Sequence, residues 1–155
     1  VEKEKLAEEF WDKGVNIIGL RYFNVYGKGQ TGTYAGVITQ FMNRLRDDLP
    51  PIIHGEGNQV RDFISVEDIA RANLLAMESN TRQDFLNIGT GKLISILDLA
   101  KMMIKISSKK MSPIFDDKLP GDVEKSQADV TRCKEKIGFY YNMNIHDGLK
   151  KLMDE

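Results

Sequence analysis

Apolar side chains recur along this chain in two alternating patterns, one typical of strands and one typical of helices. Residues 15–20 form a continuous apolar run, as in a strand buried on both faces, within a strand predicted at 15–23, and residues 84–88 form a shorter strand. Between them, residues 37–45 place apolar side chains on one helical face, and the prolines at 50 and 51 must end that helix. The alternation predicts one α/β domain, because 155 residues with 41% hydrophobic side chains suffice for a core.

Further helices are marked by residues that suit helix ends. Residues 2–13 carry acidic side chains in their first turn and are followed by Gly14, so they are predicted to be helical. Ser65 and Ser95 each stand three residues before an aspartate, which is a variant of the capping box. The predicted N-caps are Ser65, Ser95, Asp129 and Asn144, which begin helices that end near Ser79, Ile106, Gly138 and the last residues of the chain.

Two further features suggest strands and turns. Residues 52–54 and 60–64 flank a turn with glycines at 55 and 57, which predicts a β-hairpin. Ile114-Phe115 is predicted to be another short strand, and it precedes a loop that holds Pro120-Gly121-Asp122. Glycines at 27, 29 and 32 follow the long apolar run, at the strand end where open α/β sheets bind their ligands.

The charge balance argues against polyanionic partners. There are 22 basic and 23 acidic residues, so no overall field would attract nucleic acid or an anionic membrane. The longest apolar run is far shorter than the roughly 20 residues that span a bilayer, and the N-terminal residues are rich in Glu and Lys. A single cysteine, Cys133, excludes an internal disulfide. We therefore expect a cytoplasmic protein that binds any phosphate locally.

Several candidate motifs fail on spacing. Gly89-Thr90-Gly91-Lys92 precedes a helix, but the glycines that a phosphate-binding P-loop or a dinucleotide fingerprint requires are replaced by Leu86 and Ile94. Cys133 and the two histidines lack the spacing of metal ligands. The lysines at 101, 105 and 109 read as a solvated helix face. The sequence thus predicts no nucleotide-phosphate loop and no metal site.

A series of short strings occurs in the order and at the spacing of one enzyme family. They are Lys-Leu-Ala-Glu-Glu at 5–9, Arg-Tyr-Phe-Asn-Val-Tyr-Gly at 21–27, Gly-Glu-Gly at 55–57, Arg-Asp-Phe at 61–63, Val-Glu-Asp-Ile-Ala at 66–70, Asn-Ile-Gly-Thr-Gly at 87–91, Pro-Gly-Asp at 120–122 and Ser-Gln-Ala-Asp at 126–129. Together they resemble nucleotide-sugar epimerases of the UDP-glucose 4-epimerase type, which are extended short-chain dehydrogenase/reductases. The resemblance implies the C-terminal part of a Rossmann-type doubly wound sheet plus the smaller substrate-binding α/β subdomain, within residues 1–155.

The resemblance also implies a site for a nucleotide-diphosphate sugar, with UDP-hexose as the expected ligand. Asn24 would donate to a diphosphate oxygen or a sugar hydroxyl, although it could be only a turn former. Arg61 would clamp the diphosphate as a planar bidentate donor, although it could simply pair with Asp62. Asp122 would accept from the ribose, with a plain turn residue as the alternative. Val37 and His54 correspond to positions near the base pocket.

The cofactor of the complete family is NAD, and Tyr22 or Phe23 would pack near its nicotinamide. In the family a tyrosinate, from a Tyr-x-x-x-Lys helix, removes a hydroxyl proton while hydride passes to NAD and later returns to the other face. Lys5 is the candidate lysine, which would put the tyrosine at Val1; if Lys3 is the lysine, the tyrosine would precede the sequence. We therefore expect no catalysis and no NAD binding by this chain alone.

Some readings stay open. The family arginine two residues before Gly121 is Leu119 here, and the adjacent Lys118 would be a less specific substitute. The family forms homodimers, and self-association through Phe10 and Trp11 is expected for this chain. The sequence could be an expressed fragment, a proteolytic product or a truncated gene. Alternatively, it could be a stand-alone nucleotide-sugar-binding module or partner subunit, or, less in keeping with its charge, an RNA-binding relative.

Overall fold

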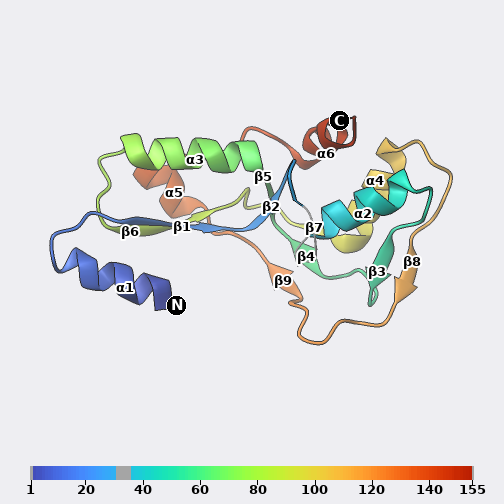
Figure 1. The fold of residues 1–155 in the computed structure, drawn as a ribbon, viewed down its shortest axis with the longest axis horizontal. Coiled ribbons are helices and arrows are strands. Elements are labelled where there is room, and N and C mark those ends of the chain that lie inside the picture. Colours follow the sequence, from blue (N-terminus) through green and yellow to red (C-terminus); the bar gives the residue numbers. More distant parts are fainter. Residues whose placement is uncertain (1, 31–35, 155) are drawn as a thin grey trace.

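A computed structural model describes residues 2–30 and 36–154 and shows a mixed α/β fold, as predicted (Figure 1). The helices are α1 (Glu2–Trp11), α2 (Val37–Arg46), α3 (Val66–Glu78), α4 (Ile96–Ile106), α5 (Thr131–Ile137) and α6 (Ile145–Asp154). The strands are β1 (Ile18–Tyr22), β2 (Asn24–Tyr26), β3 (Ile52–His54), β4 (Val60–Arg61), β5 (Phe63–Ser65), β6 (Asp84–Ile88), β7 (Ile94–Ser95), β8 (Ile114–Asp116) and β9 (Lys125–Ser126).

The strand predicted at 15–23 is present but shorter, as β1 at Ile18–Tyr22, and a second strand, β2, follows it with a different partner. β1 pairs with β6 and β2 pairs with β5, both in parallel. The change of partner falls at Phe23, whose N–H donates to the Ile88 carbonyl, and the next N–H, of Asn24, donates to the Asp62 carbonyl. Val15 is 43% exposed and residues 18–20 are only partly buried, so the expectation of burial on both faces was wrong.

The predicted helix ends are mostly confirmed. The Ser65 and Ser95 hydroxyls accept the N–H groups of the residues three positions later, at 3.1 and 3.0 Å. Asn144 Oδ1 accepts the Asp147 N–H at 2.9 Å. At α5 the N-cap position is Val130, one residue later than predicted, yet the Asp129 carboxylate still accepts the Thr131 N–H. These signals succeed because each acts within three residues.

The predicted hairpin at 52–64 was wrong. β3 pairs in parallel with β8, whereas β4 pairs antiparallel with β7 and parallel with β9. The loop between β3 and β4 instead caps α4, because the Gly57 and Gln59 carbonyls accept the Leu97 and Ile96 N–H groups. Gly57 has a φ of +76°, and a Cβ there would lie 2.9 Å from Leu97 Cβ. Gly57, which suggested a hairpin turn, instead allows the loop backbone to pack closely against the start of α4.

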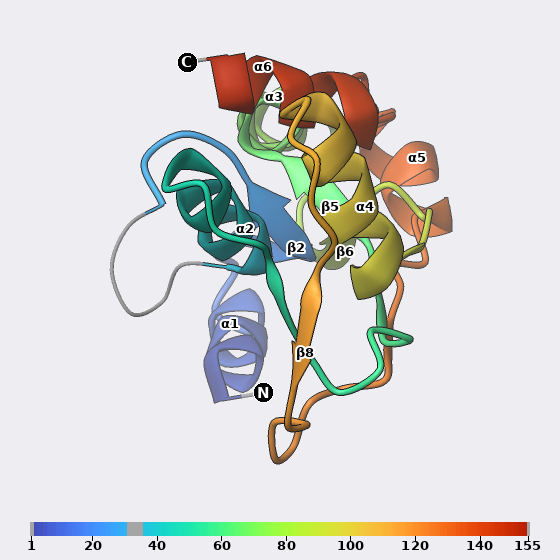
Figure 2. The same cartoon turned by 90° about the vertical axis from the view of Figure 1, so that its right-hand side faces the viewer.

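Two apolar cores fill the fold. One joins α3 and α5 to the β1–β6 pair and includes Ile64, Leu86, Ile88 and Phe139. The other lies among α2, α4, α6 and β3, where α2 and α4 lie side by side (Figures 1 and 2). Ile38, Phe41 and Leu45 are buried there, which confirms the predicted apolar face of α2. In the described residues, no helix is long and apolar enough to cross a membrane.

A buried carboxylate holds the segments between these cores. Asp62, fully buried between β4 and β5, accepts hydrogen bonds from the Thr90 N–H at 2.9 Å, the Thr90 hydroxyl at 2.6 Å, the Gly91 N–H at 2.8 Å and the Ala128 N–H at 3.2 Å. Gly89 makes room for this contact, since a Cβ on it would lie 2.8 Å from Asp62 Oδ2. One side chain therefore ties β5 to the loops after β6 and β9.

The first helix is anchored by Trp11, which corrects the expectation that this residue is free for self-association. Its ring centroid lies 4.8 Å from that of Phe85 on β6, and its Nε1–H donates to the Ile17 carbonyl at 3.0 Å. Arg21 forms an ion pair with Glu4 at 2.5 Å. Phe10 remains 39% exposed, so self-association through its side of α1 stays a prediction.

We predict that Asp62→Asn lowers the free energy of unfolding by about 1–3 kcal/mol. The substitution replaces one of the two carboxylate oxygens by an NH2 donor, so the N–H groups that donate to that oxygen lose their acceptor. Urea denaturation followed by circular dichroism measures this change. Asp117→Asn, at an exposed position, is the matched control and should change stability by no more than about 0.5 kcal/mol. Equal losses in the two variants would contradict the role given to Asp62.

Candidate functional site

A cavity of about 300 Å³ lies between α2, β2, the β3 and β4 strands and the 119–122 turn. Its lining includes Asn24, Val37, His54, Arg61 and Asp122. The structure thus brings together five of the side chains selected from the sequence, from segments nearly 100 residues apart. Leu119 also lines this cavity, where the family resemblance leads one to expect an arginine.

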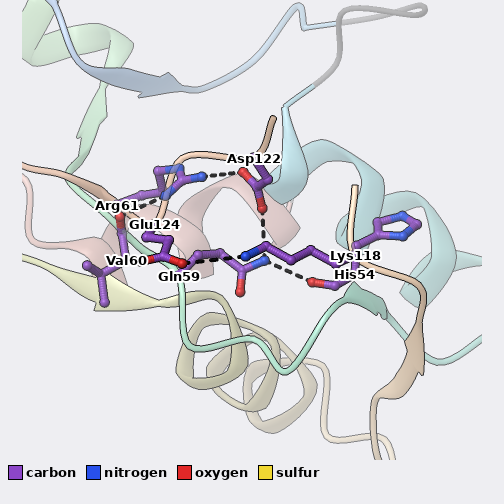
Figure 3. A network of polar contacts seen from close by, with 7 residues as sticks. All are labelled: His54, Gln59, Val60, Arg61, Lys118, Asp122 and Glu124. Atoms are coloured by element: carbon purple, nitrogen blue, oxygen red, sulfur yellow. Dashed lines mark hydrogen bonds and ion pairs between the residues drawn. The ribbon is translucent and has the colours of Figure 1, made fainter. Parts of the chain in front are cut away.

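The polar centre of the cavity is the Asp122 carboxylate. Arg61 Nη2 lies 2.5 Å from Asp122 Oδ1, and Gln59 Nε2 donates to Asp122 Oδ2 at 3.1 Å. Figure 3 shows Arg61 and Gln59 reaching Asp122 from two directions. The Arg61 side chain is 13% exposed and that of Asp122 is 23% exposed, so the pair is shielded but reachable. Arg61 therefore pairs with Asp122 and not with its neighbour Asp62.

A tight turn carries Asp122 to this position. The Asp122 N–H donates to the Leu119 carbonyl at 3.3 Å, and Gly121 has a φ of +77°. Proline followed by a glycine with positive φ at the two central positions is typical of a type II turn. The predicted turn is thus confirmed, and Asp122 also contributes its side chain to the cavity.

The other lining residues differ in how they are held. Asn24 is the first residue of β2 rather than a residue past the strand end, and its Nδ2 donates to the Asp62 carbonyl at 3.0 Å. His54 Nδ1 lies 3.2 Å from the Asp117 carbonyl oxygen at the far side of the cavity. Val37 opens α2 and is partly buried. An amide, an imidazole and an apolar side chain therefore line the same cavity as the Arg61–Asp122 pair.

Three candidate residues lie outside this cavity. Lys5 is exposed on α1, and the proposed tyrosine position Val1 lies outside the described residues, as does Gly32. Tyr22 faces α3, where its hydroxyl donates to Asn73 Oδ1 at 3.0 Å. Phe23 sits between β1 and β2 and is partly buried. The roles given to Lys5, Tyr22 and Phe23 stay predictions.

Among the cavity residues that sequence reasoning did not select are Gln59, Gln30 and Tyr26. Gln59 was read only as part of a turn, yet it bonds to Asp122. Gln30 uses both ends of its amide, donating to the Val25 carbonyl at 2.9 Å and accepting from Thr39 at 3.2 Å. Tyr26 is 3% exposed and lies between this cavity and a smaller one beside Gly148. Only Gln59 carried a usable signal, because a long amide two residues before the arginine lies on the same side of an extended chain.

The Gly89–Lys92 loop does not fit the pyrophosphate of a dinucleotide. Phosphate loops present backbone N–H groups to the ligand, but here the Thr90 and Gly91 N–H groups donate to Asp62. Lys118, the suggested substitute cation, pairs with Glu124 at 3.5 Å and does not line the cavity in the described structure. Among the described residues that line the cavity, Arg61, with a side chain 13% exposed, is therefore the cation offered to an anionic ligand.

Comparisons with known proteins agree with this architecture. The sequence pattern of the NAD-dependent epimerase/dehydratase family matches residues 2–89. The chain therefore belongs to this family. A protein of Methanocaldococcus jannaschii, provisionally named a UDP-glucose 4-epimerase, is 34% identical over 142 residues, which cover 91% of this chain and 46% of that protein.

Two solved structures of the family are close in shape. The UDP-glucose 4-epimerase of Thermotoga maritima, solved with UDP-glucose, has a TM-score of 0.95 and 36% identity, over 99% of this chain and 50% of that one. The UDP-glucuronic acid 4-epimerase of Bacillus cereus, solved with UDP-glucuronic acid and NAD, has a TM-score of 0.88 and 29% identity, over 97% and 48%. This chain thus spans about half the length of each of these relatives.

We predict that Tyr26→Phe raises the free energy of unfolding by about 1 kcal/mol at neutral pH. The Tyr26 hydroxyl is buried and has no hydrogen-bond partner among the described residues, and such a group costs about 1–3 kcal/mol. Thermal unfolding measures the change, and Tyr140→Phe, at an exposed position, is the control. A loss of stability in Tyr26→Phe would show that the hydroxyl has a partner.

The same variant should change the alkaline limit of stability. Burial, together with the nearby charges of Asp68, Glu67 and Asp147, raises the pKa of Tyr26 to about 12 from 10.0. The hydroxyl therefore ionises at a lower pH in the unfolded chain than in the folded one. Below pH 10 this difference does not change the free energy of unfolding, whereas between pH 10 and 12 it lowers it by roughly 2–3 kcal/mol. Tyr26→Phe should remove that part of the decline, which unfolding curves between pH 9 and 12 would detect.

Proposed function

We propose that this chain forms the nucleotide-sugar-binding part of an NAD-dependent UDP-hexose 4-epimerase. The observation that carries the proposal is the cavity that joins Arg61, Asp122 and Asn24, residues of three separate segments. A shielded guanidinium suits a diphosphate, because charge-assisted bonds strengthen where water is partly excluded. A carboxylate and an amide beside it suit the hydroxyl groups of a ribose and a sugar.

The ligand class is also supported by the relatives. The two solved 4-epimerases were captured with UDP-glucose and UDP-glucuronic acid, and nearly the whole length of this chain matches about half of each of them. The shared feature of those ligands is a uridine diphosphate, whereas the sugar differs. We therefore assign the diphosphate to Arg61 and leave the hexose as the variable end of the ligand.

The proposal divides the reaction between this chain and the part of the relatives that it does not span. In the complete enzyme, NAD would supply hydride acceptance and return. The residues described here would bind and orient the nucleotide sugar. A shielded cavity would also hold the sugar away from bulk water.

We predict that Arg61→Ala weakens UDP binding by about ten- to a hundredfold, since a hydrogen bond to a charged group is worth roughly 1.5–3 kcal/mol. Isothermal titration calorimetry with UDP measures the dissociation constants. Lys101→Ala, on the exposed face of α4, should leave UDP binding unchanged. Equal losses in both variants would show that the diphosphate was assigned to the wrong residue, and no UDP binding by the unmodified chain would count against the function.

We further predict that the purified chain neither interconverts UDP-glucose and UDP-galactose nor binds NAD in the micromolar range. The reason for the statement on NAD is that the Thr90 and Gly91 N–H groups, which a phosphate loop would offer to the cofactor, already donate to Asp62. The statement on turnover follows because the family reaction passes hydride to NAD. Calorimetric titration of NAD and a coupled assay of the interconversion test the two statements. Measurable turnover would show that the chain carries its own proton-transfer and cofactor groups.

A further inference from the structure

Gln59 has a fixed position that neither its sequence context nor the family resemblance assigns to any role. Its backbone carbonyl accepts the Ile96 N–H at 3.0 Å, so the start of α4 holds it in place. Its side-chain Nε2 donates to the His54 carbonyl at 2.9 Å and to Asp122 Oδ2 at 3.1 Å. The amide thus bridges the end of β3 and the 119–122 turn (Figure 3).

The contacts form a chain of three side chains into the cavity. Gln59 engages one carboxylate oxygen of Asp122, and Arg61 engages the other at 2.5 Å. A carboxylate held at one oxygen alone can rotate about its Cβ–Cγ bond, whereas one held at both cannot. The orientation of Asp122 therefore depends on the Gln59 amide. The Arg61 guanidinium is held at Nη1 by the Val60 carbonyl at 3.0 Å, and its second anchor, at Nη2, is the carboxylate that Gln59 fixes.

We propose that Gln59 is a positioning residue of this cavity, which fixes Asp122 so that Arg61 is pre-oriented for a nucleoside diphosphate. The role belongs to the nucleotide-sugar site and so rests on the function proposed above. Pre-orientation improves affinity because the ligand does not have to restrict the arginine when it binds.

Gln59→Met tests this role, because methionine keeps the length of the side chain and removes its donor. UDP binding, measured by calorimetry, should weaken about two- to tenfold, the range of one neutral hydrogen bond. Gln83→Met is the matched control, since the Gln83 amide also donates to a backbone carbonyl, that of Trp11 at 3.3 Å, but away from the cavity. An unchanged dissociation constant in Gln59→Met would overturn the proposal.

A double-mutant cycle separates positioning from a general structural effect. Because Gln59 is proposed to act through Asp122, Gln59→Met should weaken UDP binding no further in the Asp122→Ala background. The same loss in both backgrounds would mean that Gln59 acts by another route, and it would also overturn the proposal.

A readout without ligand keeps this role distinct from the proposed function. The side-chain Nε–Hε resonance of Arg61, assigned by its disappearance in Arg61→Lys, reports how firmly the guanidinium is held. Its hydrogen exchange should be about two- to tenfold faster in Gln59→Met than in the unmodified chain or Gln83→Met. If UDP does not bind at all but this difference appears, the function fails and the positioning stands. Equal exchange in all three proteins would overturn the positioning.

Discussion

The fold depends on one buried carboxylate at the meeting point of its two cores. Asp62 lies where β4 passes into β5, and its four donors come from the loops after β6 and β9. Those loops leave regular pairing at this point, so their N–H groups need an acceptor that the strands do not supply. A charged oxygen can accept several such bonds at once, which a backbone carbonyl in a ladder cannot.

This structural role is coupled to binding by the geometry of an extended chain. Successive side chains point to opposite faces, so the inward placement of Asp62 directs the preceding Arg61 toward the cavity. The Asp62 carbonyl also accepts from Asn24, which fixes a second cavity residue. Asp62 thus positions two residues of the site, Arg61 and Asn24, although it does not line the cavity itself. A substitution at Asp62 would affect ligand binding only through the fold.

How much could be predicted from the sequence follows from the range of each interaction. The caps at Ser65 and Ser95 act over three residues and were predicted, whereas the pairing of β3 with β8 joins segments about 60 residues apart and left no local trace. Asn24, Arg61 and Asp122 were selected only because their strings resemble a family. For Gln59 the spacing from Arg61 indicated the side of the chain, but the hydrogen bond to Asp122, 63 residues away, could not be predicted from local sequence.

The pairing of Arg61 with Asp122 also limits what the arginine can contribute. The Arg61 guanidinium is paired with the Asp122 carboxylate at 2.5 Å, so a bound diphosphate gains less from Arg61 than it would from an unpaired cation. Arginine suits this arrangement because it carries five N–H donors, of which the described contacts use one on Asp122 and one on the Val60 carbonyl. It can therefore keep Asp122 and still present donors to a phosphate. With Leu119 beside it, the cavity relies on this shared guanidinium, and so on whatever holds Asp122 in place.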